Sequence, residues 1–158
     1  MKVLIGCEYS GIVRDAFTAS GHDATSCDLL PSDQPHGKHI QGDVFEAIKS
    51  QHWDLAIFHP PCTDLAISGA CWFPEKIKDG RQARAIEFVE RLYDCNIKKI
   101  AIENPVGVLS TKSKLGKPTQ YVQPYEYGHY ETKKTGLWLR GLKPLIPTDI
   151  KDLTGLPK

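Results

Sequence analysis

Residues 53–64 read WDLAIFHPPCTD, an apolar run that stops at two prolines and a cysteine. A nearly continuous apolar run of this length is typical of a central strand in a parallel sheet, because such a strand is buried on both faces. Proline fixes its own φ angle and restricts the residue before it, so Pro60 and Pro61 stiffen the backbone that presents Cys62. The stretch therefore predicts a buried strand whose end holds one cysteine in a fixed place.

Strand and helix patterns alternate on both sides of this stretch. The expected strands are 2–6, 22–30, 53–59 and 97–104, with 40–44 as a further short strand or a turn, and the helices between them are 10–21, 45–51 and 81–96. The expected apolar helix faces are Ile12, Val13, Ala16 and Phe17 in the first helix, and Ala85, Ile86, Val89, Leu92 and Tyr93 in the last. Residues 134–142 read as a later strand, with 121–128 as the other arm of a hairpin. This alternation predicts an α/β fold with a mostly parallel sheet and helices on both faces.

Three segments lack a regular pattern. Residues 63–80 contain Gly69, Pro74 and Gly80, and they read as a long loop with some local helix. Loops of this length inside a small domain are usually functional or mobile. Residues 105–120 read mostly as loop, and the proline-rich tail 144–158 reads as irregular. Because we find no repeat and no domain boundary, we expect one compact domain over residues 1–158.

Composition excludes several classes of protein. Apolar residues make up 41% and charged residues 25%, a balance typical of soluble globular domains. No apolar run approaches the roughly 20 residues that cross a bilayer, and the start MKVLIGCEYS is too short for a secretory signal. The five cysteines include no CxxC pair, which argues against a disulfide framework or a zinc site. HGKH at 36–39 reads as a solvated loop, so we expect no metal. The lack of a long apolar run predicts no membrane, and the cysteine pattern predicts a reducing, cytoplasmic location.

Charge is spread unevenly along the chain. Residues 1–97 carry 9 Lys and Arg against 14 Asp and Glu, whereas residues 98–158 carry 11 against 5. A basic C-terminal third can face phosphates, and it can equally be a solvated surface. The cluster of Lys112, Lys114 and Lys117 leaves the same two readings open.

Polar residues follow the expected parallel strands at the points where the strands end. These residues are Glu8, Ser10, Gly11, Asp28, Asp43, His59, Cys62, Glu103 and Asn104. Ligands of open parallel sheets bind beyond the carboxyl ends of the strands. We therefore expect a binding site along this one edge of the sheet.

The residue types at these strand ends suggest a specific chemistry. Asp28 lies 17 residues after Gly11, near the place where a carboxylate accepts hydrogen bonds from ribose hydroxyls. Cys62 fits a nucleophile if it is exposed and a structural thiol if it is buried. A protonated Glu103 in a closed site could donate to a ring nitrogen of a base, with Asn104 beside it. Together they suggest covalent attack on an aromatic ring.

The order of these short motifs resembles that of the cytosine carbon-5 DNA methyltransferases. That family carries PC after one strand and ENV after the next, where this chain has PPC at 60–62 and ENP at 103–105. CEYSGIVRDAF at 7–17 looks like the first, glycine-containing motif of the family. SCDL at 26–29 takes the place of its acidic residue after the second strand, and GDV at 42–44 resembles its GDI. Small phage and prophage proteins with HPPCT and IENP segments are similar too.

The resemblance implies a Rossmann-like methyltransferase fold, S-adenosylmethionine as the cofactor and a bacterial host. The cofactor residues would be Glu8, Ser10, Gly11, Asp28, Asp43 and Pro60, with Asp28 on the ribose and Asp43 on the adenine amino group. The catalytic residues would be Cys62, which attacks ring carbon 6, Glu103, which holds ring nitrogen 3, and Asn104. The substrate residues would be Pro61, Thr63, Trp72, Lys133 and Lys134. Segment 63–80 would close over a cytosine flipped out of DNA.

Several positions depart from the pattern of the family. The departures are Cys7 for Phe, Tyr9 for Gly, Thr63 for Gln and Ala66 for Ser. We find no Q-x-R-x-R segment, for which Lys133 and Lys134 could serve, and no G-N-S-V segment. We also expect no separate target-recognition domain within 1–158. The substrate is therefore open between DNA read loosely, DNA delivered by a partner and a free cytosine nucleotide, and a homo-oligomer is open as well.

Two other functions fit parts of the same pattern. Amino-methyltransferases of adenine or cytosine also carry two prolines after a strand, but with Asp, Asn or Ser before them, and His59 matches this poorly. A non-catalytic module that binds the cofactor or nucleic acid would accommodate Tyr9, Thr63 and Ala66. The module predicts that Cys62→Ala leaves biological function intact, whereas the enzyme predicts its loss.

Overall fold

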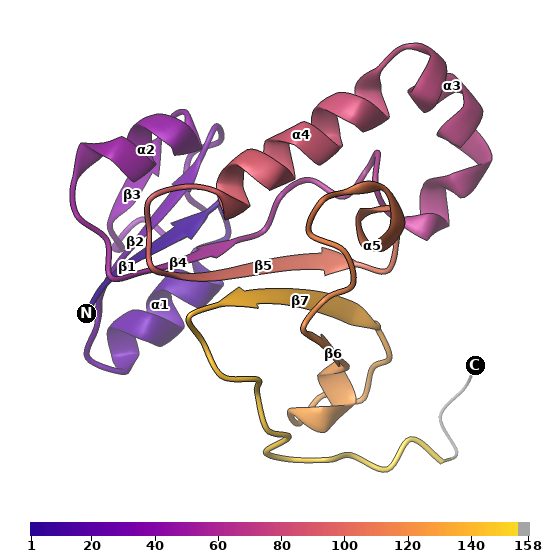
Figure 1. The fold of residues 1–158 in the computed structure, drawn as a ribbon. Coiled ribbons are helices and arrows are strands. Elements are labelled where there is room, and N and C mark those ends of the chain that lie inside the picture. Colours follow the sequence, from indigo (N-terminus) through magenta and orange to yellow (C-terminus); the bar gives the residue numbers. More distant parts are fainter. Residues whose placement is uncertain (155–158) are drawn as a thin grey trace.

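A seven-stranded sheet forms the centre of the molecule (Figure 1). The computed structural model describes residues 1–154. The strands lie in the order β3-β2-β1-β4-β5-β7-β6. Their bounds are β1 Lys2–Gly6, β2 Asp23–Asp28, β3 His39–Gln41, β4 Leu55–Phe58, β5 Lys99–Pro105, β6 Gln120–Val122 and β7 Thr135–Arg140. Every strand expected from the sequence is therefore present.

The sheet is mostly parallel, with one reversed strand. β1 pairs in parallel with β2 and β4, while β2 pairs with β3 and β4 with β5 in the same sense. β7 runs antiparallel to both β5 and β6, which confirms the predicted hairpin. The chain builds outward from β1 through β2 to β3 and then crosses to β4. Open α/β sheets bind ligands in the crevice at such a switch point, here between β1 and β4.

Helices cover both faces of the sheet, as the alternation predicts (Figure 1). Their bounds are α1 Ile12–Ala19, α2 Val44–Ser50, α3 Phe73–Lys78, α4 Arg81–Tyr93 and α5 Leu109–Lys112, with 3₁₀ turns at Ile67–Trp72 and Pro124–Glu126. α1 packs Val13 and Phe17 against a small core on one face of β1 and β4. α2 and α4 close the larger core on the other face, where Val89 and Leu92 are fully buried. The predicted apolar face of α4 is thus confirmed.

The predicted apolar face of α1 is partly wrong. Ile12 is 69% exposed and Ala16 is exposed too, whereas Arg14 is fully buried. The Arg14 guanidinium donates to Ser26 Oγ and Ser32 Oγ, each at 3.1 Å. A buried charged group of this kind requires hydrogen-bond partners, and the helix turns to bring Arg14 to them instead of presenting Ile12.

The irregular segments contain more helix than the sequence predicts. Segment 63–80 holds a 3₁₀ turn and α3, and the segment after β5 holds the short α5. Pro74 lies in the first turn of α3, where its missing N–H leaves no hydrogen bond unmade. Residues 141–154 form neither helix nor strand, as expected for the tail, while 155–158 lie outside the described residues. No helix within 1–154 is long and apolar enough to cross a membrane.

Candidate active site

Two adjacent cavities lie at the carboxyl ends of the parallel strands and share Cys7. The first has a volume of about 160 Å³ and is lined by Cys7, Cys27, Asp28, Leu29, Gly42, Asp43, Val44, Pro61 and Phe88. The second has about 250 Å³ and is lined by Cys7, Glu8, Tyr9, Ser10, Val13 and His59. The structure thus brings together the predicted ends of β1, β2 and β4 and the start of α2.

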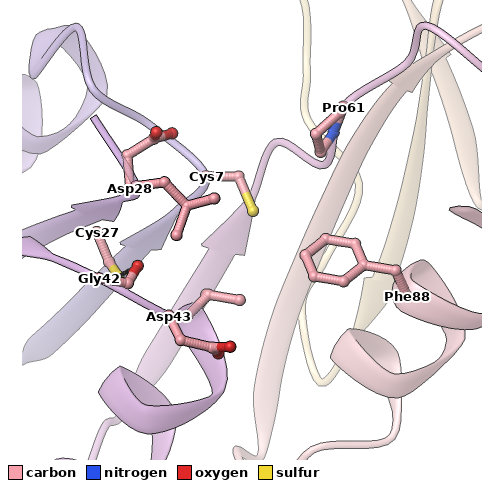
Figure 2. Close-up of a pocket in the computed structure, with 9 residues that line it drawn as sticks. Cys7, Cys27, Asp28, Gly42, Asp43, Pro61 and Phe88 are labelled. Carbon is pink, nitrogen blue, oxygen red and sulfur yellow. Dashed lines mark hydrogen bonds between the residues drawn. The ribbon is translucent and has the colours of Figure 1, made fainter.

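The first cavity offers two carboxylates and one aromatic ring (Figure 2). Asp28 Oδ1 accepts the N–H of Leu30 at 3.0 Å, and Asp43 Oδ1 accepts the N–H of Phe45 at 2.6 Å. Each bond fixes the position of its carboxylate. The Phe88 ring, from α4, faces the cavity from the side opposite Cys7. Beyond its place in a helix, no sequence pattern indicated Phe88, because its position at the cavity depends on how α4 crosses the strand ends.

The two thiols in this cavity are held in their neutral form. Burial raises the pKa of Cys7 to about 12, helped by the nearby carboxylate of Asp28. Burial likewise raises the pKa of Cys27 to about 11. A nucleophilic cysteine needs an accessible thiolate, so neither thiol is suited to attack. Cys7 also has a φ of 60°, a left-handed backbone that is uncommon for a residue other than glycine and lets the chain turn sharply after β1.

The second cavity lies over the start of α1. Glu8 is only 6% exposed, and its carboxylate accepts the N–H groups of Val13 at 2.7 Å and Arg14 at 3.3 Å. Ser10 donates to the same carboxylate at 3.1 Å, and Gly11 adopts a φ of 75° at the N-cap position. These carboxylate contacts satisfy amides that the first turn of a helix leaves without partners. Glu8 and Ser10 therefore shape the floor of this cavity by capping α1.

Cys62 lies in a turn whose backbone is tied to the neighbouring strand. Asn104 is 1% exposed, and its amide donates to the Pro60 carbonyl at 3.0 Å. The carbonyl of Cys62 accepts the N–H groups of Leu65 at 2.9 Å and Ala66 at 2.8 Å, and its side chain is partly exposed. The structure therefore gives Asn104 a positioning contact. A partly exposed thiol on a fixed turn meets the accessibility requirement for a nucleophile.

Glu103 lies beside Asn104 on β5 but points to the opposite face, since side chains alternate along a strand. Its Oε2 is 3.2 Å from Nδ1 of His59, and both side chains are partly exposed. This contact joins the ends of β4 and β5 across the predicted edge. No sequence pattern indicated that His59 and Glu103 meet, because they are 44 residues apart in the chain.

The segment after Cys62 is anchored to the segment after β5. Ile67 N–H donates to the Val106 carbonyl at 3.0 Å, and Val108 N–H donates to the Leu65 carbonyl at 2.9 Å. The buried Lys76 donates to the Thr63 carbonyl and lies 3.4 Å from Asp64 Oδ1. These contacts hold the thiol turn and the end of β5 in one framework.

The remaining predicted substrate residues are exposed around this edge. Pro61 and Thr63 flank Cys62, and Trp72 is 58% exposed in the 3₁₀ turn before α3. Lys133 and Lys134 directly precede β7, whose first residue pairs with the last residue of β5. Lys134 Nζ lies 4.5 Å from the centre of the Tyr121 ring. Within residues 1–154 there is no cluster of three or more His, Cys, Asp or Glu that could hold a metal ion.

No family model and no curated protein matches this sequence. Among solved structures, the chain is similar to a crystal structure from E. coli described as a candidate DNA modification methyltransferase encoded within a prophage. The TM-score is 0.61 at 16% sequence identity, and the match covers 99% of this chain and 55% of the other. The chain thus spans about half the length of that protein. The likeness shows the fold: a Rossmann-like mixed α/β fold with a mostly parallel seven-stranded sheet, which this chain shares with that protein.

Proposed function

We propose that this chain transfers a methyl group from S-adenosylmethionine to carbon 5 of cytosine in DNA, through a covalent bond from Cys62. The observation that carries the proposal is the Cys62 turn. This turn carries a partly exposed thiol at the carboxyl-end edge of the parallel strands, and Asn104 ties the turn to the strand that bears Glu103. The E. coli neighbour is described as a candidate DNA modification methyltransferase, and by analogy this description supports S-adenosylmethionine as the methyl donor.

The linings of the two cavities support S-adenosylmethionine as the cofactor. The first cavity combines a flat aromatic ring, Phe88, with the carboxylates of Asp28 and Asp43, which suits a base and a ribose. The neutral thiols of Cys7 and Cys27 keep its inner wall uncharged. The second cavity, over the start of α1, would take the methionine part near Ser10. The bound cofactor would supply an electrophilic methyl group on a sulfonium centre.

The residues of this chain then carry the remaining steps. Cys62 loses its proton to solvent, and its sulfur forms a bond to ring carbon 6 while Glu103 gives a proton to ring nitrogen 3. The electron pair displaced toward carbon 5 would accept the methyl group, which leaves the bound cofactor as the neutral thioether. Loss of the proton from carbon 5 to a base, with return of the nitrogen proton, breaks the sulfur–carbon bond and frees Cys62. Asn104 keeps the turn in place throughout by its bond to Pro60.

Trapping on a fluorinated substrate tests this reaction. The protein is incubated with S-adenosylmethionine and DNA that contains 5-fluorocytosine, and its intact mass is measured. Fluorine at carbon 5 cannot leave as a proton, so the methylated adduct persists and the mass rises by that of the DNA and one methyl group. We expect the adduct in the wild type and in Cys71→Ala, which removes an exposed thiol of the 3₁₀ turn before α3, but not in Cys62→Ala.

Two other outcomes discriminate between the alternatives. An adduct only with the fluorinated free nucleotide would keep the chemistry and replace DNA as the substrate. The absence of an adduct with either substrate, while S-adenosylmethionine still binds, would favour a non-catalytic module.

A further inference from the structure

His59 sits between the predicted nucleophile turn and the predicted acid. It directly follows β4, three residues before Cys62, and lines the second cavity. Its Nδ1 is 3.2 Å from Glu103 Oε2, with both side chains more than two-thirds covered. The ring is therefore held between the second cavity and the Glu103 carboxylate.

The surroundings of Nε2, the second ring nitrogen of His59, indicate which of the two nitrogens carries the proton. Nε2 of His59 is covered from solvent and has no hydrogen-bond partner among residues 1–154. A proton on Nε2 would be a buried donor without an acceptor, whereas a bare Nε2 is a buried acceptor without a donor, and native proteins leave N–H donors unpaired less often than acceptors. Nδ1, by contrast, has the Glu103 carboxylate as an acceptor. The favoured form is thus the neutral ring with its single proton on Nδ1.

Other acidic groups near the ring are engaged elsewhere. Glu8 lines the same cavity, but its two oxygens accept from Ser10, Val13 and Arg14. Glu103 is thus the carboxylate to which His59 donates. Because Oε2 accepts that proton, a proton carried by Glu103 itself lies on Oε1.

We propose that His59 is a positioning residue: as a neutral Nδ1–H donor it fixes Oε2 of Glu103 and so presents Oε1 as the oxygen that protonates the target ring. The inference rests on the proposed function for the identity of the target, and on geometry alone for the state of the ring. The stiffness of the two prolines that follow His59 accounts for the Cys62 turn only. His59 itself would orient the Glu103 side chain on the neighbouring strand β5.

Nitrogen NMR of protein labelled with ¹⁵N-histidine tests the state of the ring directly. The His59 signals are identified by their loss in His59→Asn. At neutral pH we expect a protonated Nδ1 and an unprotonated Nε2, and we expect Glu103→Ala to abolish this preference. A ring protonated on Nε2, or on both nitrogens, would overturn the inference. This measurement needs no substrate, so its result stands even if the proposed reaction is absent.

Kinetics then test what the donor does. His59→Leu removes the donor and should lower kcat by about 10- to 100-fold, the scale of loss expected from a misplaced catalytic group, with little change in KM. In His59→Asn, the amide can donate from near the Nδ1 position, and it should recover about tenfold of that loss. Equal kcat in the two variants, with wild-type unfolding curves, would contradict positioning. Complete inactivity of the wild type would instead contradict the proposed function.

Discussion

Buried polar side chains fix the geometry of the candidate site. Asn104 ties the Cys62 turn to β5, and Glu8 caps α1 beneath the second cavity. The sequence predicts both residues in the site from their places after apolar strands, Glu8 for the cofactor and Asn104 for catalysis, but it does not predict these structural contacts. The partner itself depends on strand order, which a single sequence leaves open. Arg14 was missed for a related reason, since its acceptors at Ser26 and Ser32 lie on another element.

The raised pKa of Cys7 makes stability depend on pH in the alkaline range. The pKa of its thiol is about 12 in the folded state against an ordinary 9.0, so the unfolded chain loses this proton first. Above about pH 9 the unfolded state binds fewer protons, and the free energy of unfolding falls by at most about 1.4 kcal/mol per pH unit for one such thiol. We expect urea unfolding of Cys7→Ser to show a shallower fall than the wild type between about pH 8 and pH 10.

The exposed Cys71 supplies the control for this comparison. Cys71→Ser removes a thiol that folding leaves exposed, so its stability should follow the wild-type curve with pH. Lysine and tyrosine side chains titrate alike in all three proteins and cancel in the difference. Parallel curves for wild type and Cys7→Ser would show that Cys7 is not desolvated as described.

At the level of elements, the site depends on two segments that approach very closely. Segment 63–66 forms a bridge with the segment that follows β5, at Ala66 and Gly107. A Cβ atom on Gly107 would lie 2.0 Å from the Leu65 carbonyl oxygen, which is backbone and cannot turn away. Glycine is therefore required where the Cys62 turn meets the end of β5.

Gly107→Ala should separate these segments. We expect a loss of about 1–3 kcal/mol in the free energy of unfolding, as found for added methyl groups in packed sites. Faster proteolysis within 63–80 should accompany it, because two interstrand hydrogen bonds at Leu65 and Ile67 are lost. Thermal unfolding and timed digestion measure the two effects.

Gly42→Ala is the matched control, since a Cβ atom there would meet nothing within 4 Å. It should unfold and be digested nearly as the wild type is. If Gly107→Ala also behaved as the wild type, the close approach of the two segments would not be essential to the fold.

The elements that the sequence predicted well are those with a strong period. β1, β4, β5 and α4 have apolar patterns that burial enforces, and they lie where expected. Segment 63–80 was predicted mostly as loop because its short helices bury few apolar side chains. Lys76 and Asp64 stabilise it instead, through contacts that have no periodicity in sequence. The hairpin of β6 and β7 was predictable from its two β-rich arms.

Over the whole molecule, the lysines of the basic C-terminal third differ in whether they are bound to other residues of the protein. Lys112 donates to Gln82 at 2.7 Å, and Lys114 forms an ion pair with Asp94. These two lysines already have partners within the protein, which favours a structural role for them. Lys133 and Lys134 are exposed beside the end of β5, so they are the better placed to meet a phosphate.

The sequence predicts a binding site at one edge of the sheet, because the carboxyl ends of parallel strands lie at the same edge in any strand order. Asp28 and Asp43 lie at that edge and line the first cavity, whereas Cys62 follows β4 at the same edge without lining either cavity. The residues that complete the site come from elements that cross the edge. Phe88 reaches it from α4, and the contact of His59 with Glu103 requires β4 and β5 to be neighbours. Such contacts depend on tertiary packing rather than on local pattern.

The salt dependence of binding discriminates between DNA and a free nucleotide for the molecule as a whole. If Lys133 and Lys134 contact DNA phosphates, the affinity falls with salt, and each Lys→Ala change reduces the magnitude of the log–log slope by about 1. Lys114→Ala should leave that slope unchanged, because its ammonium is paired with Asp94. Fluorescence titration of a short duplex at several salt concentrations measures all three variants. A slope that none of them alters would place the phosphates elsewhere. A flat response in the wild type would favour a nucleotide, whose few charges release few counterions.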